Sequence, residues 1–217
     1  MTKLFAHRGF TSNGNLAQNS IASLKNAYKA GFRAIEFDVW FFDKKLVLSH
    51  DEPKKQTSSQ LPNLCDYFCF KNEIEYWIDF KNLNQKNIET ALELAKTIIA
   101  EAEIELDKIY FAPFITDYKI SQEILKITRK IFGDKMKFMA VCDKLENKNQ
   151  IKALHEFLQK NEIKHLSIFH QLINENFMKI FCDVEIFAWT VNNEKRLREL
   201  EAFGVKNFAT DLKLIEI

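Results

Sequence analysis

The sequence predicts an α/β fold in which eight parallel strands, alternating with helices, close into a compact TIM-type (β/α)8 barrel. The strand-like segments are short apolar runs, as expected for strands buried on both faces, and helical stretches separate them. The length of 217 residues suits one such barrel. An open doubly wound sheet is the alternative, but it would need a glycine-rich phosphate-binding turn, and none is present. Because no interdomain linker or internal repeat is found, residues 1–217 are expected to form a single domain.

The N-terminal third contains three barrel strands and one hairpin. The first strand covers 3–6, and apolar residues at helical spacing follow it from Ile21 to Tyr28, with Gly31 as the C-terminal stop. The second strand covers 34–39. A turn at 43–45 returns the chain into a short strand at 46–49, which is expected to pair with it as a hairpin-like extension. A modest helix is expected near 61–70, and the third barrel strand follows at 75–80.

The rest of the chain alternates regularly between helix and strand. Residues 86–102 have the clearest helical pattern, with apolar side chains from Ile88 to Ala102 at three- and four-residue spacing. The remaining strands are expected at 108–114, 137–142, 164–169, 184–190 and 207–209. The helices between them are expected at 118–132, 150–160, near 175–181 and at 194–203.

The composition indicates a soluble cytoplasmic protein. A net charge of +1 gives no nucleic-acid-binding footprint, and no apolar run approaches the roughly 18 residues of a membrane span. The N-terminus enters a strand directly and lacks the apolar region of a signal peptide. Four cysteines, Cys65, Cys69, Cys142 and Cys182, have no zinc-ligand spacing beyond one C-x₃-C, and they are expected to be buried free thiols in a reducing compartment. The oligomeric state is not indicated.

The strand at 34–39 carries the most unusual feature, two carboxylates within an apolar run. Side chains two residues apart on a strand share a face, so Glu36 and Asp38 are expected to converge. Two such carboxylates repel each other and are costly to bury unpaired, and a hard divalent cation would resolve this. On this reasoning, removal of Asp38 should leave the stability of the metal-free protein unchanged or higher.

Other polar residues stand at the C-terminal ends of the expected strands, where the active sites of such barrels lie. Taken singly, each could be a loop hydrogen bond, a structural ion pair or a core residue. Their convergence on one mouth by chance is harder to explain. These residues are His7, Arg8, Glu36, Asp38, His50, Asp79, Lys81, Trp189, Thr190 and Asp211.

The residue types suit the cleavage of a phosphodiester. Three carboxylates, Glu36, Asp38 and Asp79, would hold one Mg²⁺ or Ca²⁺ ion, and the carboxylate count suits both metals. Arg8 offers a planar fork for the non-bridging phosphate oxygens, and Lys81 adds a point charge.

Two histidines could carry the proton transfers. Imidazole titrates near neutral pH, so His7 and His50, on opposite sides of the phosphorus, could act as general base and general acid. The sequence does not decide which histidine is the base, because that depends on the pose of the substrate.

Several motifs between residues 6 and 211 are typical of one enzyme family. They are Ala6-His7-Arg8-Gly9, Gln18-Asn19-Ser20, Glu36-x-Asp38-Val39, Leu46-Val47-x-x-His50-Asp51, Asp79-x-Lys81, Ala188-Trp189-Thr190-Val191-Asn192 and Thr210-Asp211. On these motifs, the chain resembles the glycerophosphodiester phosphodiesterase family, part of the phosphatidylinositol-phospholipase-C-like barrel group.

The resemblance implies a metal-dependent hydrolase of lipid metabolism that cleaves glycerophosphodiesters to glycerol 3-phosphate and an alcohol. Its partner would be a small-molecule phosphodiester substrate. Asn19 would be a contact of the phosphate or of the metal shell, or alternatively a helix N-cap. By the same resemblance, the metal ligands are Glu36, Asp38 and Asp79, the catalytic histidines His7 and His50, the phosphate contacts Arg8 and Lys81, and Trp189 lines the mouth.

Three departures from the family pattern bear on the substrate. Gln18 stands where the family usually has Glu, and Asp79 replaces the usual Glu of the third strand, as in the similar sphingomyelinase D branch. Only about 25 residues separate Asp51 from Trp77, so the family's usual insertion after the His-Asp motif is missing and a more open mouth is expected. The alternatives are therefore a phosphodiesterase or lyase acting on a lysophospholipid or a glycan-linked phosphodiester, and a non-catalytic barrel that binds a phosphorylated ligand.

Overall fold

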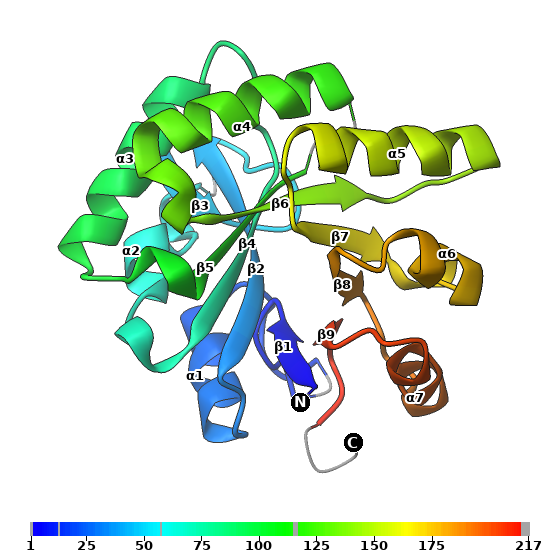
Figure 1. The fold of residues 1–217 in the computed structure, drawn as a ribbon. Helices are drawn as coiled ribbons and strands as arrows, with labels where there is room; N and C mark the ends of the chain where they lie inside the picture. Colours follow the sequence, from blue (N-terminus) through cyan, green and yellow to red (C-terminus); the bar gives the residue numbers. More distant parts are fainter. Residues whose placement is uncertain (1, 13, 57, 115–116, 214–217) are drawn as a thin grey trace.

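A closed ring of eight parallel strands forms the centre of the molecule (Figure 1). The computed structural model describes residues 2–12, 14–56, 58–114 and 117–213. The barrel strands are β1 (Lys3–His7), β2 (Ala34–Phe42), β4 (Glu75–Phe80), β5 (Ile109–Pro113), β6 (Lys137–Cys142), β7 (His165–Phe169), β8 (Glu185–Trp189) and β9 (Asn207–Thr210). Because β9 pairs with β1 and β1 pairs with β2, the ring closes, and the predicted TIM-type barrel is confirmed.

The ninth strand, β3 (Lys45–Leu48), lies outside the ring and pairs antiparallel with the end of β2. The predicted hairpin extension is therefore present. The strand β2 runs three residues beyond the expected 34–39, to Phe42, because its last residues pair with β3. Asp43 and Lys44 both have positive φ, which allows the tight turn between the two strands.

Helices cover the outside of the barrel, and one precedes each barrel strand from β2 to β9 (Figure 1). They are α1 (Ile21–Lys29), α2 (Leu64–Tyr67), α3 (Ile88–Glu101), α4 (Tyr118–Phe132), α5 (Lys148–Lys160), α6 (Glu175–Ile180) and α7 (Glu194–Ala202). The helix expected near 61–70 is only one turn long, α2, and a 3₁₀ turn at Lys71–Glu73 follows it.

The interior of the barrel is filled with side chains. The ring of Phe5 lies edge-on against Trp77 and Tyr110, with centroid distances of 5.5 and 5.7 Å, and tilted against Phe187 at 5.7 Å. This interior cluster consists of Phe5, Ala34, Trp77, Tyr110, Ala112, Met139, Val141, Phe187 and Ala209. Because these residues fill the barrel interior, the polar side chains at the C-terminal strand ends lie against a packed apolar core.

All four cysteines are free, as expected, but only Cys142 is buried. The expectation of burial is wrong for Cys65, Cys69 and Cys182, which are exposed. In the α2 segment the core-facing positions are taken by apolar and aromatic residues such as Tyr67, so the two cysteines lie on the outer face. Within the part of the chain that the structure describes, no helix is long and apolar enough to cross a membrane.

Candidate active site

A small cavity of about 150 Å³ opens at the C-terminal ends of the barrel strands. The predicted site residues line it, with the exceptions of Asn19, Asp38 and Asp211. Asn19 and Asp38 are buried behind its wall, and Asp211 contacts His7. The lining residues are His7, Arg8, Glu36, His50, Trp77, Asp79, Lys81, Phe114, Ser167, Trp189 and Thr190. The sequence analysis did not place Trp77, Phe114 and Ser167 in the site.

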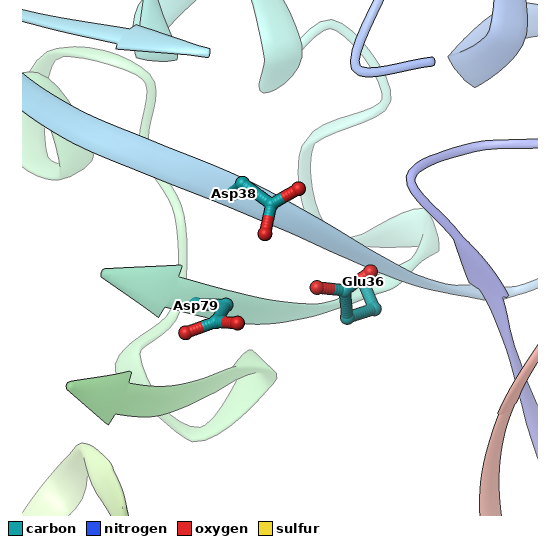
Figure 2. A group of neighbouring side chains, drawn as sticks. All are labelled: Glu36, Asp38 and Asp79. Carbon is teal, nitrogen blue, oxygen red and sulfur yellow. The ribbon is translucent and has the colours of Figure 1, made fainter. Parts of the chain in front are cut away.

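Three carboxylates from two adjacent strands form the acidic part of the site (Figure 2). Glu36 and Asp38 lie on β2, and the register pairs Asp38 with Asp79 on β4. One oxygen from each carboxylate lies within 4.8 Å of the others. Burial and the charges of Asp38 and Asp79 hold the pKa of Glu36 well above its usual range. Burial raises the pKa of Asp79 to about 6, although the charge of Lys81 opposes this shift.

The donor set fits a hard divalent cation. All three groups offer carboxylate oxygens, the ligands that Mg²⁺ and Ca²⁺ prefer. Oδ1 of Asp79 is buried and accepts no hydrogen bond, whereas Oδ1 of Asp38 lies 2.8 Å from the ammonium of Lys81. Buried polar atoms normally have a partner, so the free oxygen of Asp79, beside two further carboxylates, indicates a place for a cation. Among the described residues, these three acids are the group that could hold a metal ion.

Asp38 is held from behind by Arg8 and Asn19. Its Oδ2 lies 3.0 Å from Nε of Arg8 and accepts a hydrogen bond of 2.8 Å from Nδ2 of Asn19. The backbone N–H of Asp38 donates to Oδ1 of Asn19 at 3.1 Å, so the amide grips both the side chain and the backbone. The N-cap of α1 is Ser20, which excludes the alternative that Asn19 is the cap. Asn19 is therefore a residue that positions Asp38.

The His7-Arg8-Gly9 motif forms a sharp turn after β1. Arg8 adopts a φ of 54° and its backbone N–H donates to Oε2 of Glu36 at 3.1 Å. Its guanidinium donates to Oε1 of Gln18 at 3.0 Å. At Gly9, with a φ of 78°, a Cβ would lie 2.5 Å from Oγ of Ser23, so any side chain would collide with α1. Glycine is required there by both space and backbone conformation.

His7 forms a dyad with Asp211. Its Nδ1 lies 3.0 Å from Oδ1 of Asp211, while its Nε2 lies 3.3 Å from the hydroxyl of Thr190 and 4.0 Å from Glu36. Burial alone would raise the pKa of Asp211, but the hydrogen bonds from His7 and Asn192 outweigh it and hold the pKa below its usual range. An ionised carboxylate can only accept, so Nδ1 carries the proton and Nε2 can accept one.

The second histidine is held much more loosely. The side chain of His50 is 50% exposed, and its Nδ1 lies 2.8 Å from Oδ1 of Asp51, itself 93% exposed. His50 follows β3 and lines the same cavity as His7 at the end of β1. Its ring is therefore accessible both to solvent and from the cavity.

Lys81 and the aromatic side chains form another wall. Nζ of Lys81 lies 2.5 Å from Oδ2 of Asp79, 2.8 Å from Oδ1 of Asp38, and 4.6 Å from the centroid of the Phe114 ring. Burial would lower the pKa of Lys81, but the two carboxylates outweigh it and raise the pKa. The ring of Trp189 faces Phe114 at 6.4 Å. The sequence signal for Phe114 was its place at the C-terminal end of the strand expected at 108–114, and in the structure it directly follows β5.

Paired acids, two basic side chains and two histidines thus stand at the mouth of a closed parallel barrel, an arrangement that suits the binding of a phosphate group. The chain is 24% identical over 249 residues to a Bacillus subtilis protein assigned to the glycerophosphodiester phosphodiesterases, covering 96% of this chain and 93% of that protein. A glycerophosphodiester phosphodiesterase of Bacillus altitudinis is 38% identical over 68 residues, which cover 31% of this chain and 27% of that protein. No family model matches the chain.

Solved structures share the fold over almost the whole chain. A glycerophosphodiester phosphodiesterase from Parabacteroides distasonis superimposes with a TM-score of 0.77 at 21% identity, covering 98% of this chain and 93% of that one. A phosphodiesterase from Oleispira antarctica, in complex with the product sn-glycerol-3-phosphate, gives 0.77 at 16% identity, with coverages of 97% and 93%. The expected resemblance to the glycerophosphodiester phosphodiesterase family is thus confirmed.

The wider barrel group is also represented. A calcium-dependent phosphoinositol-specific phospholipase C from Pseudomonas superimposes with a TM-score of 0.63 at 10% identity, covering 96% of this chain and 87% of that one.

The alignment with the Bacillus subtilis protein is longer than this chain, so that protein carries segments that are absent here. This agrees with the compact barrel expected from the short connection after the His-Asp motif.

Proposed function

We propose that the protein is a metal-dependent phosphodiester hydrolase that cleaves glycerophosphodiesters to glycerol 3-phosphate and an alcohol, a step of lipid metabolism. The observation that carries the proposal is the cavity itself, in which three acids, two cations and a His–Asp dyad meet. The names of the relatives support it, as does the glycerol 3-phosphate bound to one neighbour. The four free cysteines support a reducing, cytoplasmic setting. In this proposal residues 1–217 form one domain, and its substrate is a small molecule.

In this proposal Glu36, Asp38 and Asp79 hold one divalent ion, Mg²⁺ or Ca²⁺. The bound ion supplies Lewis-acid polarisation of a phosphoryl oxygen. Arg8 and Lys81 contact the non-bridging oxygens of the phosphate, since both line the cavity next to the acids. Trp189 packs against the non-polar face of the group held in the mouth.

We assign His7 the role of general base because its Nδ1 lies 3.0 Å from the carboxylate of Asp211. Nε2 of His7 removes a proton from the attacking hydroxyl, and the carboxylate of Asp211 stabilises the imidazolium that forms. His50, on the open side, gives a proton to the leaving alkoxide. When a substrate hydroxyl next to the phosphate attacks first, the product is a cyclic phosphate, which water then opens with the two histidines in exchanged roles.

The size of the cavity limits what can be enclosed. Its volume of about 150 Å³ is below the roughly 300–1,000 Å³ of pockets that enclose drug-sized ligands. A phosphate with a three-carbon group is a suitable occupant, and a larger alcohol would extend into solvent past the exposed His50. The second candidate, a lysophospholipid or glycan-linked phosphodiester, is favoured by this open side and by Asp79 in place of Glu.

The test is the release of glycerol 3-phosphate from glycerophosphocholine by the wild type and His7→Ala, with Mg²⁺, Ca²⁺ or EDTA. Release that needs the metal and is lost in His7→Ala is the expected result. Release that persists in EDTA would reject the metal dependence. Absence of release with every metal, together with turnover of lysophospholipids or phosphate-decorated glycans, would favour the second candidate.

A further inference from the structure

The side-chain ammonium of Lys81 lies between two of the three acids proposed as metal ligands. Its Nζ is 2.8 Å from Oδ1 of Asp38 and 2.5 Å from Oδ2 of Asp79. All three side chains are at least 85% buried, so solvent screens these contacts weakly. The Lys81 ammonium therefore already neutralises part of the charge of Asp38 and Asp79, and the same side chain lines the cavity.

Few oxygens remain for a second cation at Asp38. Its Oδ2 is occupied by Arg8 and Asn19, at 3.0 and 2.8 Å. Its Oδ1 accepts no hydrogen bond, but it is the oxygen beside the Lys81 ammonium. A divalent ion bound to Asp38 would thus share Oδ1 with Lys81, and the two positive charges would repel each other across a buried site.

The two oxygens of Asp79 can contact Lys81 and a divalent ion at the same time, and the Phe114 ring offers the Lys81 ammonium a second contact. Oδ2 of Asp79 contacts Lys81 while its buried Oδ1 accepts no hydrogen bond. The face of the Phe114 ring lies 4.6 Å from the ammonium and can hold a cation. Both residues line the cavity, so a small rotation of the lysine keeps its charge in the site while it leaves Asp38.

We infer that Lys81 is a tethered competitor of the divalent ion. It neutralises Asp38 and Asp79 until an ion binds, and it then gives up Oδ1 of Asp38 and turns toward Phe114 and the mouth. There its ammonium meets the phosphate of the substrate, so metal binding and phosphate binding are coupled through one side chain. This inference rests on the metal site of the proposed function and adds a motion of Lys81 to it.

The test measures metal affinity rather than turnover. Isothermal titration calorimetry of EDTA-treated, desalted protein with CaCl₂ and MgCl₂ compares the wild type with Lys81→Met, which keeps the length of the side chain but removes its charge. We expect Lys81→Met to bind the ion at least tenfold more tightly, and Lys81→Arg, which keeps the charge, to stay near the wild type. An equal or weaker affinity of Lys81→Met would overturn the inference.

Direct competition must be separated from a general effect of charge. In 1 M KCl the Debye length is about 3 Å, so effects of exposed charges elsewhere on the surface are screened, while the contacts of the buried Lys81 ammonium are screened much less. The tenfold difference should therefore survive in 1 M KCl, and its disappearance would overturn the inference.

A second measurement keeps the inference testable if Lys81→Met folds poorly. In the wild type, the ¹⁵Nζ resonance of Lys81 is expected to shift when Ca²⁺ is added to the EDTA-treated protein, because the ammonium leaves Asp38. A resonance unchanged at saturating Ca²⁺ would overturn the inference. Both measurements are independent of turnover, so they remain decisive if glycerophosphocholine is not a substrate.

Discussion

Asp211, which follows the last barrel strand, accepts a hydrogen bond of 3.0 Å from His7, which ends the first. The closure of the barrel brings them together, because Ala6 of β1 pairs with Thr210 of β9. A second contact fixes the carboxylate, as Asn192 donates to its other oxygen at 2.5 Å. The histidine is thereby held with its Nε2 toward the cavity.

The dyad predicts a large catalytic effect of Asp211→Asn. An asparagine can donate to Nδ1 and so favours the other tautomer of His7, in which Nε2 carries the proton and cannot accept one. We expect kcat to fall by about 10²-fold or more while KM changes little. Steady-state kinetics of glycerol 3-phosphate release would measure this split.

The chain offers a matched control in the other histidine pair. Asp51→Asn removes the partner of His50, but that aspartate is 93% exposed and orients its histidine weakly. We expect kcat to change by less than about threefold in this variant. Equal losses in the two variants would contradict the assignment of His7–Asp211 as the pair that sets the tautomer.

Asp38 is predicted to stabilise the fold even without a metal, which reverses the expectation from the sequence. That expectation considered only the repulsion between Glu36 and Asp38. The structure adds two cations, since Arg8 and Lys81 lie 3.0 and 2.8 Å from its carboxylate. Asp38→Asn would leave both buried charges with one partner fewer, which costs about 3–5 kcal/mol when a buried pair is broken.

Thermal unfolding in EDTA would measure this effect as a fall in Tm of roughly 10 °C. The matched control is Asp134→Asn, which breaks an ion pair of 3.3 Å with Arg129 in which the aspartate is 89% exposed. This variant should change the stability by no more than about 1 kcal/mol. An unchanged or higher Tm for Asp38→Asn would restore the repulsion argument.

Asn19 is predicted to tune metal affinity through Asp38. Because its amide fixes both the carboxylate and the backbone of Asp38, its loss should weaken metal binding by about 10–100-fold. Asn19→Gly is the suitable variant, since the φ of 53° at this position suits glycine and adds no backbone strain. Calorimetric titration with CaCl₂ would measure the change.

A control separates loss of the amide from damage to the loop. Asn19→Asp keeps the size of the side chain but replaces the amide donor to Asp38 with a second carboxylate oxygen and a negative charge. If Asn19→Gly binds the ion as tightly as the wild type, the amide does not position the ligand.

The sequence predicted the barrel well because its strands are short apolar runs, and a period of two placed Glu36 and Asp38 on one face. It could not predict that, of these two acids, Glu36 lines the cavity and Asp38 does not. The position of Asp38 is set by contacts with Arg8 and Asn19, which lie in a separate loop. The role of Asp211 likewise depends on barrel closure, which brings together residues 204 positions apart.

Two cavity residues were missed for a different reason. Trp77 was taken as an ordinary apolar residue of a strand, although its place two residues before Asp79 puts it on the same inward face. Ser167 stands alone as a polar residue in the middle of β7, where it is buried and reaches the cavity. An isolated polar residue at an inward strand position was the signal that could have identified it.

His165 predicts a pH dependence of stability that is separate from the active site. It begins β7, at the opposite end of the barrel, where burial lowers its pKa although Glu185 and the carbonyl of Phe138 favour the charged form. The positive charge of the nearby Lys137 also lowers the pKa of His165. Since the unfolded state takes up this proton at a higher pH than the folded state, the stabilising contribution is complete above the unfolded pKa of about 6.5 and is lost as the pH falls below it.

Urea unfolding between pH 8 and pH 5 would measure this dependence for the wild type and for His165→Gln, which keeps a polar side chain but cannot take up the proton. We expect the free energy of unfolding of the wild type to fall more steeply below pH 6.5 than that of the variant, with no such difference in slope between pH 7 and pH 8. A wild-type curve that rises relative to the variant as the pH falls would mean that His165 is protonated more readily in the folded state, through its 3.5 Å contact with Glu185.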